Sequence, residues 1–119
     1  MNRIKSQIRR GDIFIANLNP VIGSEQQGVR PVVIVSSDDE INVGSNTVIV
    51  APLSSSKRDK HPFHVVVTSK ASGIDKSSMI LTEQIRTIDK TRLIKKVAVC
   101  PRNVLNSLNE ALKVSLKIK

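Results

Sequence analysis

Aromatic residues are nearly absent from this 119-residue chain, which has two Phe and neither Trp nor Tyr. Many proteins that bind single-stranded nucleic acids stack the bases on aromatic rings. If this chain binds such a ligand, any base selectivity must come from hydrogen bonds, arginine planes and the shape of a groove. Cysteine occurs only at Cys100, which excludes a disulfide within the chain and fits a reducing compartment. We interpret Cys100 as a small buried filler rather than a nucleophile.

Long apolar runs are also absent. No run is long enough to span a bilayer, and none of signal-peptide length follows the basic N-terminal stretch MNRIKSQIRRGD. We therefore expect a cytoplasmic protein with no membrane partner. The length is that of one ordinary domain, so we expect a single domain over residues 1–119.

Acidic residues are few, with 10 Asp and Glu against 19 Lys and Arg. The formal charge of +9 and the pI near 10.2 favour a polyanionic partner, and nucleic acid is the first candidate. A membrane surface is less suitable, because the one markedly amphipathic helical pattern is needed for the core. A basic surface that only keeps the protein soluble is the plainer alternative.

Short apolar runs separated by turn signals predict a β-rich fold. The runs are rich in β-branched residues at consecutive positions, so we expect several strands to be buried on both faces and to close into a small barrel. After Pro101 the apolar residues recur every three or four positions through Leu116, which predicts an amphipathic helix packed against that barrel. The predicted strands cover residues 13–16, 32–35, 48–51, 65–67, 79–81 and 97–99.

Two polar residues stand at the ends of predicted strands. Arg30 follows a loop of more than ten residues, and Pro31 biases it toward extended backbone, so a guanidinium on a stiff strand end can aim several donors at a phosphate or carboxylate. A salt bridge at the rim of the fold is the alternative role. Ser54 precedes a basic loop that contains Lys57, and its hydroxyl either donates to a phosphate or begins a turn.

The two histidines make a weak metal site. His61 and His64 have no Cys, Asp or Glu nearby at ligand spacing. We interpret them as marking a loop that leads into the next strand, and we expect neither a metal nor any other cofactor.

Three stretches in chain order, spread between residues 9 and 93, resemble the MazF/PemK family of toxin endoribonucleases. They are RRGDIFIANLNPVIGSEQQGVRPVVIVSS, TVIVAPLSSS and LTEQIRTIDKTRL. The resemblance implies a small SH3-like β-barrel of the MazF/PemK/CcdB type with a C-terminal helix. It also implies a homodimer, metal-independent cleavage of single-stranded mRNA, and inhibition by a cognate acidic antitoxin of a type II toxin-antitoxin system.

The same resemblance assigns roles to individual residues. Arg30 matches the family's catalytic arginine, and Ser54 matches a position where a threonine commonly donates a proton. Serine keeps the hydroxyl but loses the methyl group that restricts its rotamer. The predicted RNA-binding residues are Glu25 and Gln26 in the family's mobile loop, Glu83 and Gln84 at the dimer groove, and Lys57 and Arg86.

Without a metal, the 2′-hydroxyl next to the scissile phosphate is the natural nucleophile, and its attack leaves a 2′,3′-cyclic phosphate and a 5′-hydroxyl. Arg30 serves either as base or as an electrostatic clamp, and the clamp is physically easier because a guanidinium pKa lies above about 12. With Arg30 as clamp, Glu25 or Glu83 is the base. Two other functions stay open: a gyrase-poisoning toxin on the same fold, and a basic nucleic-acid-binding barrel without catalysis.

Overall fold

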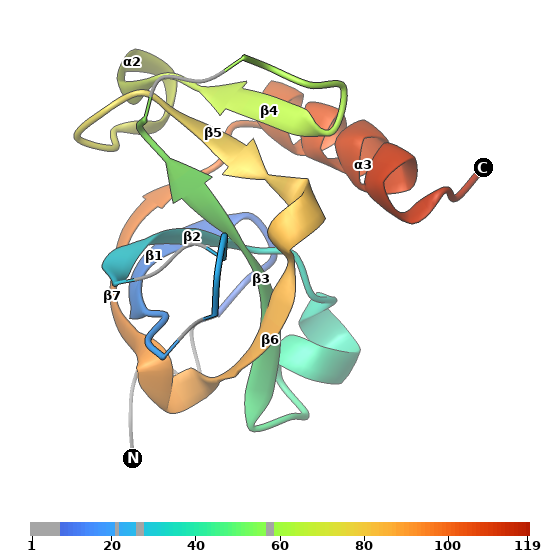
Figure 1. Ribbon diagram of the computed structural model, residues 1–119. Coiled ribbons are helices and arrows are strands. Elements are labelled where there is room, and N and C mark those ends of the chain that lie inside the picture. Colours follow the sequence, from blue (N-terminus) through green and yellow to red (C-terminus); the bar gives the residue numbers. More distant parts are fainter. Residues whose placement is uncertain (1–7, 21, 26–27, 57–58) are drawn as a thin grey trace.

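The computed structural model describes residues 8–20, 22–25, 28–56 and 59–119. A mostly antiparallel sheet and one long C-terminal helix make up the fold (Figure 1). The strands are β1 (Asp12–Asn17), β2 (Val29–Ile34), β3 (Thr47–Ser54), β4 (His64–Val67), β5 (Ser78–Leu81), β6 (Arg86–Asp89) and β7 (Leu93–Val99). The helical segments are η1 (Asp38–Asn42), α2 (Ser69–Ser72), η2 (Thr82–Gln84), η3 (Lys90–Arg92) and α3 (Arg102–Leu116).

The seven strands follow the order β4-β5-β3-β2-β1-β7, and β6 pairs with β3 beside this path. Strand β3 joins two parts of the sheet, because residues 47–50 pair with β6 whereas Leu53 and Ser54 pair with β5. Figure 1 shows β7, β1, β2, β3 and β6 curling around one centre, with β4 and β5 extending away toward α3. No pairing between β6 and β7 is recorded for the described residues, so the predicted barrel is present in an open form.

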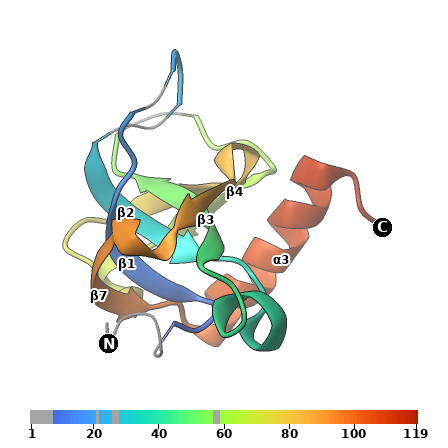
Figure 2. The ribbon, with the colours of Figure 1, turned by 90° about the horizontal axis from the view of Figure 1, so that it is seen from below.

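Both faces of the central strands are buried, as the consecutive apolar residues predict. Phe14, Val32 and Val50 belong to the cluster inside the curled part of the sheet. Their neighbours Val33 and Ala51 belong to a second cluster, which α3 covers through residues such as Leu108. Figure 2 shows α3 running along one side of the molecule from the end of β7. Alternating side chains of one strand therefore support two separate cores.

Each predicted strand corresponds to an observed one, and the predicted C-terminal helix is α3. Strand β6 was not predicted, because Ile88 is its only buried residue and the rest of the strand is polar or partly exposed. Pro101 is the N-cap residue of α3. His64 begins β4, one residue before the predicted strand start.

The segment from Arg9 to Asp12 forms a corner that connects the sheet to α3 through hydrogen bonds. Gly11 has a φ of +92°, donates to Ile34 O at 2.8 Å, and accepts from Cys100 N at 2.9 Å. A Cβ at this position would lie 2.9 Å from a methyl carbon of Leu105. The buried Asp12 accepts from Arg9 N at 2.8 Å and pairs with Lys96 Nζ at 3.2 Å. The positive φ favours glycine at this position, and a Cβ would in addition require the Leu105 side chain to shift.

Candidate nucleic-acid interface

Arg30 and Ser54 stand at adjacent strand ends. Strands β2 and β3 pair antiparallel, with Val32 opposite Pro52. Arg30 lies two residues before Val32 on β2, and Ser54 lies two residues after Pro52 on β3, so both stand at the same end of this strand pair. The two predicted catalytic residues therefore share one corner of the fold.

Ser54 and Ser55 differ in accessibility. Ser54 is only 2% exposed, and its Oγ accepts a hydrogen bond from Ser56 N at 3.3 Å. This contact corresponds to the turn-forming role, one of the two roles that the sequence suggested for the Ser54 hydroxyl. Ser55 is exposed and lines the same cavity as Arg30. A second hydroxyl thus lies beside the predicted one.

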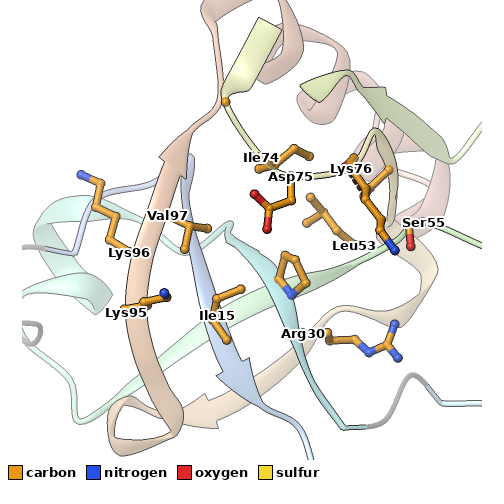
Figure 3. Close-up of a pocket in the computed structure, with 13 residues that line it drawn as sticks. Ile15, Arg30, Leu53, Ser55, Ile74, Asp75, Lys76, Lys95, Lys96 and Val97 are labelled. Atoms are coloured by element: carbon orange, nitrogen blue, oxygen red, sulfur yellow. Dashed lines mark hydrogen bonds between the residues drawn. The ribbon is translucent and has the colours of Figure 1, made fainter. Parts of the chain in front are cut away.

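The larger cavity at this corner has a volume of about 690 Å³ and extends from Arg30 across the sheet to β7 (Figure 3). Its apolar lining includes Ile15, Pro31 and Val97, and cationic side chains stand around it. Figure 3 shows Arg30 at one side of the cavity and Lys95 at the other. A polyanion bound at Arg30 would meet further positive charge along this face.

A second cavity of about 350 Å³ collects residues that lie far apart in the sequence. Pro52 lines this smaller cavity and Leu53 lines the larger one, so the end of β3 separates the two cavities. This division follows from the alternation of side chains along a strand. The lining of the smaller cavity consists of Leu18, Glu25, Pro52, Glu83, Gln84, Ile85 and Arg86.

Four predicted RNA-binding residues therefore come together, namely Glu25, Glu83, Gln84 and Arg86. Glu25 lies in the long segment between β1 and β2, whereas Glu83 and Gln84 form η2 and Arg86 begins β6. Gln26 and Lys57 lie outside the described residues. Neither Ser54 nor Arg30 lines the smaller cavity, which adjoins their corner across β3.

The stem of the β1–β2 segment is held by several hydrogen bonds. Arg86 Nη1 donates to Leu18 O at 3.1 Å, and Leu18 N donates to Gly28 O at 3.0 Å. Gly28 N in turn donates to Asn19 Oδ1 at 2.9 Å. Arg86 thus has a structural contact in addition to its place in the smaller cavity, and it fixes the segment that leads to Arg30.

A histidine–carboxylate pair was missed by the sequence reasoning. His64 Nε2 lies 3.2 Å from Glu83 Oε1, and His64 Nδ1 accepts from His61 N at 3.3 Å. Because Nδ1 is an acceptor, the neutral ring carries its proton on Nε2 and donates it to Glu83. The buried His64 therefore holds Glu83 at the smaller cavity. The 19-residue separation gave no local signal for this pair.

Cys100 is buried, as predicted, at 3% exposure. Burial, with a smaller contribution from the nearby Asp12 carboxylate, raises the pKa of the Cys100 thiol to about 11. A thiol with such a pKa is a poor nucleophile near neutral pH.

Among the described residues, no group of three or more His, Cys, Asp and Glu side chains is arranged to hold a metal ion. In the same ranges, no helix combines the length and apolarity needed to cross a bilayer.

The family of PemK-like, MazF-like toxins of type II toxin-antitoxin systems matches residues 9–116. The chain belongs to this family.

The relatives agree with this membership. The chain is 39% identical over 111 residues to Endoribonuclease EndoA of Bacillus subtilis (strain 168), covering 93% of this chain and 96% of the relative. Its fold is similar to that of MazF from Deinococcus radiodurans, with a TM-score of 0.78 at 24% identity and coverage of 92% and 96%. A mycobacterial endoribonuclease solved in complex with its cognate antitoxin has a TM-score of 0.76 at 21% identity, with coverage of 94% and 97%.

Proposed function

We propose that this toxin is an endoribonuclease that cleaves single-stranded mRNA at a short sequence without a metal ion. The observation that carries the proposal is the antiparallel pairing of β2 and β3, because Arg30 and Ser54 stand at the same end of this strand pair, between two cavities that polar residues line in part. The 39% identity to Endoribonuclease EndoA supports the same activity.

In the proposed mechanism the 2′-hydroxyl of the substrate attacks the neighbouring phosphate. Arg30 holds the phosphate and stabilises the charge of the crowded phosphorane, since a guanidinium supplies several fixed donors. Ser54 donates a proton to the leaving 5′-oxygen, and Glu25 or Glu83 removes the proton of the 2′-hydroxyl. The products are a 2′,3′-cyclic phosphate and a 5′-hydroxyl.

The two candidate bases differ in how they are held. Glu83 is fixed by His64 at 3.2 Å, whereas Glu25 is exposed in the β1–β2 segment. Both line the smaller cavity, together with Gln84 and Arg86. We propose that this cavity also receives nucleobases of the RNA. Its amide and charged groups would recognise these nucleobases by hydrogen bonds. Gln26 and Lys57 are proposed to contact the RNA from the neighbouring loops.

We propose that the toxin acts as a homodimer. Val66 on β4 is 48% exposed and Val114 on α3 is 54% exposed, and both line a groove between the two elements. Lys60 and Glu110 give this groove one charge of each sign, in addition to His64. A chain of net charge +9 associates with its own copy most easily through such a weakly charged apolar face.

The proposed inhibitor is a cognate antitoxin with an acidic segment that folds over the basic surface. Charge complementarity and coupled folding favour such a partner, and its binding should weaken as salt rises. RNA and the acidic segment should compete, because both are drawn to the same excess of positive charge.

Incubation of the purified protein with an unstructured RNA and excess EDTA tests the proposed activity. Cleavage by the parent protein and its loss in Arg30→Ala are expected, and a folded Arg30→Ala variant is verified by circular dichroism. Binding of RNA without cleavage would instead support a non-cleaving nucleic-acid-binding barrel. Inhibition of gyrase without cleavage would support a topoisomerase poison.

A further inference from the structure

The larger cavity continues well past Arg30, and two further lysines line it on opposite sides. Lys95 lies on β7 opposite Ile15 of β1, and Lys76 lies on the segment after α2. Figure 3 shows the amine of Lys95 directed toward Ile15, and Lys76 across the cavity near Ser55. No ion-pair partner for either amine is recorded among the described residues. Two positive charges therefore face the cavity from opposite sides.

The other charged residues of the cavity leave it cationic. Lys96 lines the cavity, but its Nζ pairs with the buried Asp12 at 3.2 Å, and Figure 3 shows its tip pointing away. Among the described residues that line the cavity, Asp75 is the single acidic one. Against it stand Arg30, Lys76 and Lys95. A ligand with more than one negative charge fits this arrangement.

The segment that carries Lys76 is anchored to the fold. Ile74 is 6% exposed and belongs to the core under α3. Ser78 Oγ donates to Lys76 O at 3.0 Å, and Ser69 N donates to Ser77 Oγ at 2.9 Å. The backbone beside Lys76 is thus held in place before a ligand binds, which reduces the entropy cost of binding.

We propose that this cavity binds the RNA strand next to the scissile phosphate, with phosphates at Lys76 and Lys95 and a ribose or base against the apolar lining. The inference rests on the proposed function and extends its substrate path beyond Arg30. The volume of about 690 Å³ lies in the range of small-molecule sites and suits a nucleotide. The apolar lining of Ile15, Pro31 and Val97 offers a surface for a sugar or base face, and the surrounding cations suit the backbone.

The salt dependence of binding measures these phosphate contacts. Each contact on single-stranded nucleic acid contributes about 0.7 to the slope of log K against log salt. The double variant Lys76→Gln/Lys95→Gln should therefore reduce the slope by about 1.4 and weaken binding about tenfold near 0.15 M salt. The loss should be similar for all RNA sequences, because phosphate contacts carry no sequence information.

The probe is a fluorescent, uniformly 2′-O-methylated RNA of about 12 nucleotides, which lacks the 2′-hydroxyl needed for cleavage. Its binding is measured by anisotropy between about 0.05 and 0.2 M salt. Lys113→Gln/Lys117→Gln is the matched control, since both lysines lie at the C-terminal end of α3 outside the cavity lining and the pair loses the same two charges. This control should keep the parent slope.

Cleavage kinetics separate the inference from the proposed function. With natural RNA, the double variant should show a raised KM and a kcat within about twofold of the parent, as expected when binding is lost equally in ground and transition states. If the parent binds RNA without cleaving it, the proposed function is wrong. The slope measurement then still tests whether the cavity binds RNA phosphates. An unchanged slope in the double variant would overturn the inference even if cleavage is normal.

A final binding experiment uses an acidic peptide in place of RNA. Polyglutamate of similar length is titrated against the parent and the double variant under the same salt conditions. If the double variant loses affinity for polyglutamate and not for RNA, the cavity is a protein-binding site and the inference is wrong. A loss for RNA that equals or exceeds the loss for polyglutamate supports it.

Discussion

Replacement of Ser54 by alanine tests whether the Ser54 hydroxyl acts in catalysis or only forms a turn. In the structure Ser54 Oγ accepts from Ser56 N at 3.3 Å, and loss of one such hydrogen bond costs about 0.5–1.5 kcal/mol of stability. General acid assistance is worth about a hundred- to ten-thousand-fold in rate, which corresponds to about 2.7–5.4 kcal/mol. A catalytic Ser54 therefore gives an activity loss far larger than its effect on folding.

The assay is single-turnover cleavage at saturating protein, with RNA affinity and unfolding measured in parallel. Ser54→Ala should cripple cleavage and leave RNA binding nearly unchanged, because the hydroxyl acts only in the transition state. Ser54→Thr should retain activity, and its melting temperature reports whether the added methyl fits at a site only 2% exposed. Neither result depends on knowing the cleaved sequence.

Ser55→Ala is the matched control, since Ser55 is the next residue, carries the same hydroxyl, and lines the larger cavity with Arg30. It should cleave at close to the parent rate. If Ser54→Ala cleaves normally and Ser55→Ala is crippled, the reasoning from register is refuted and the exposed Ser55 supplies the proton. If both variants cleave normally, water supplies it and Ser54 only forms the turn.

Three further predictions concern the corner, the thiol and the dimer. Gly11→Ala should destabilise the fold by about 1–3 kcal/mol in urea unfolding, because φ is +92° and the new Cβ would crowd Leu105; a change below about 0.5 kcal/mol would contradict this. The Cys100 thiol should resist iodoacetamide at pH 8 in the native state. Stability should fall as pH rises from 9 toward 11, because the folded state keeps the thiol proton that the unfolded state loses, and Cys100→Ala should make this fall smaller. Light scattering should give twice the chain mass of 13.1 kDa, and Val66→Asp should shift the protein to monomer; a parent monomer at micromolar concentration would argue against the dimer.

Much of the fold could be predicted because its strands are buried on both faces. A strand such as β3 then appears as a continuous apolar run, and the change of period after Pro101 separates α3 from the strands. Strand β6 escaped prediction because its single buried residue, Ile88, produces no pattern. Its pairing with β3 depends on the tertiary fold and not on its own sequence.

The candidate site could be predicted only in part. The ends of β2 and β3 could be recognised in the sequence. The pairing of these two strands places Arg30 and Ser54 at the same end. The burial of Ser54 and the exposure of Ser55 depend on how the chain turns after β3, which a run of serines does not specify. The contact of His64 with Glu83 joins residues brought together only by the pairing of β4 with β5.

The larger cavity could not be predicted, because its lining comes from β1, β2, β3, β7 and the segment after α2. Lys76 and Lys95 look like ordinary surface lysines in the sequence. Only the three-dimensional arrangement puts the two lysines across one cavity from each other, in a lining that also contains Arg30.

The chemical ends of the cleavage products test the central claim most directly. An RNA cut in the presence of EDTA is analysed by mass spectrometry, beside the same sequence made with 2′-deoxyribose. Attack by the 2′-hydroxyl predicts fragments with a 2′,3′-cyclic phosphate and a 5′-hydroxyl, and no cleavage of the deoxy strand. Fragments that carry a 5′-phosphate, or equal cleavage of the deoxy strand, would contradict the mechanism assigned to Arg30 and Ser54.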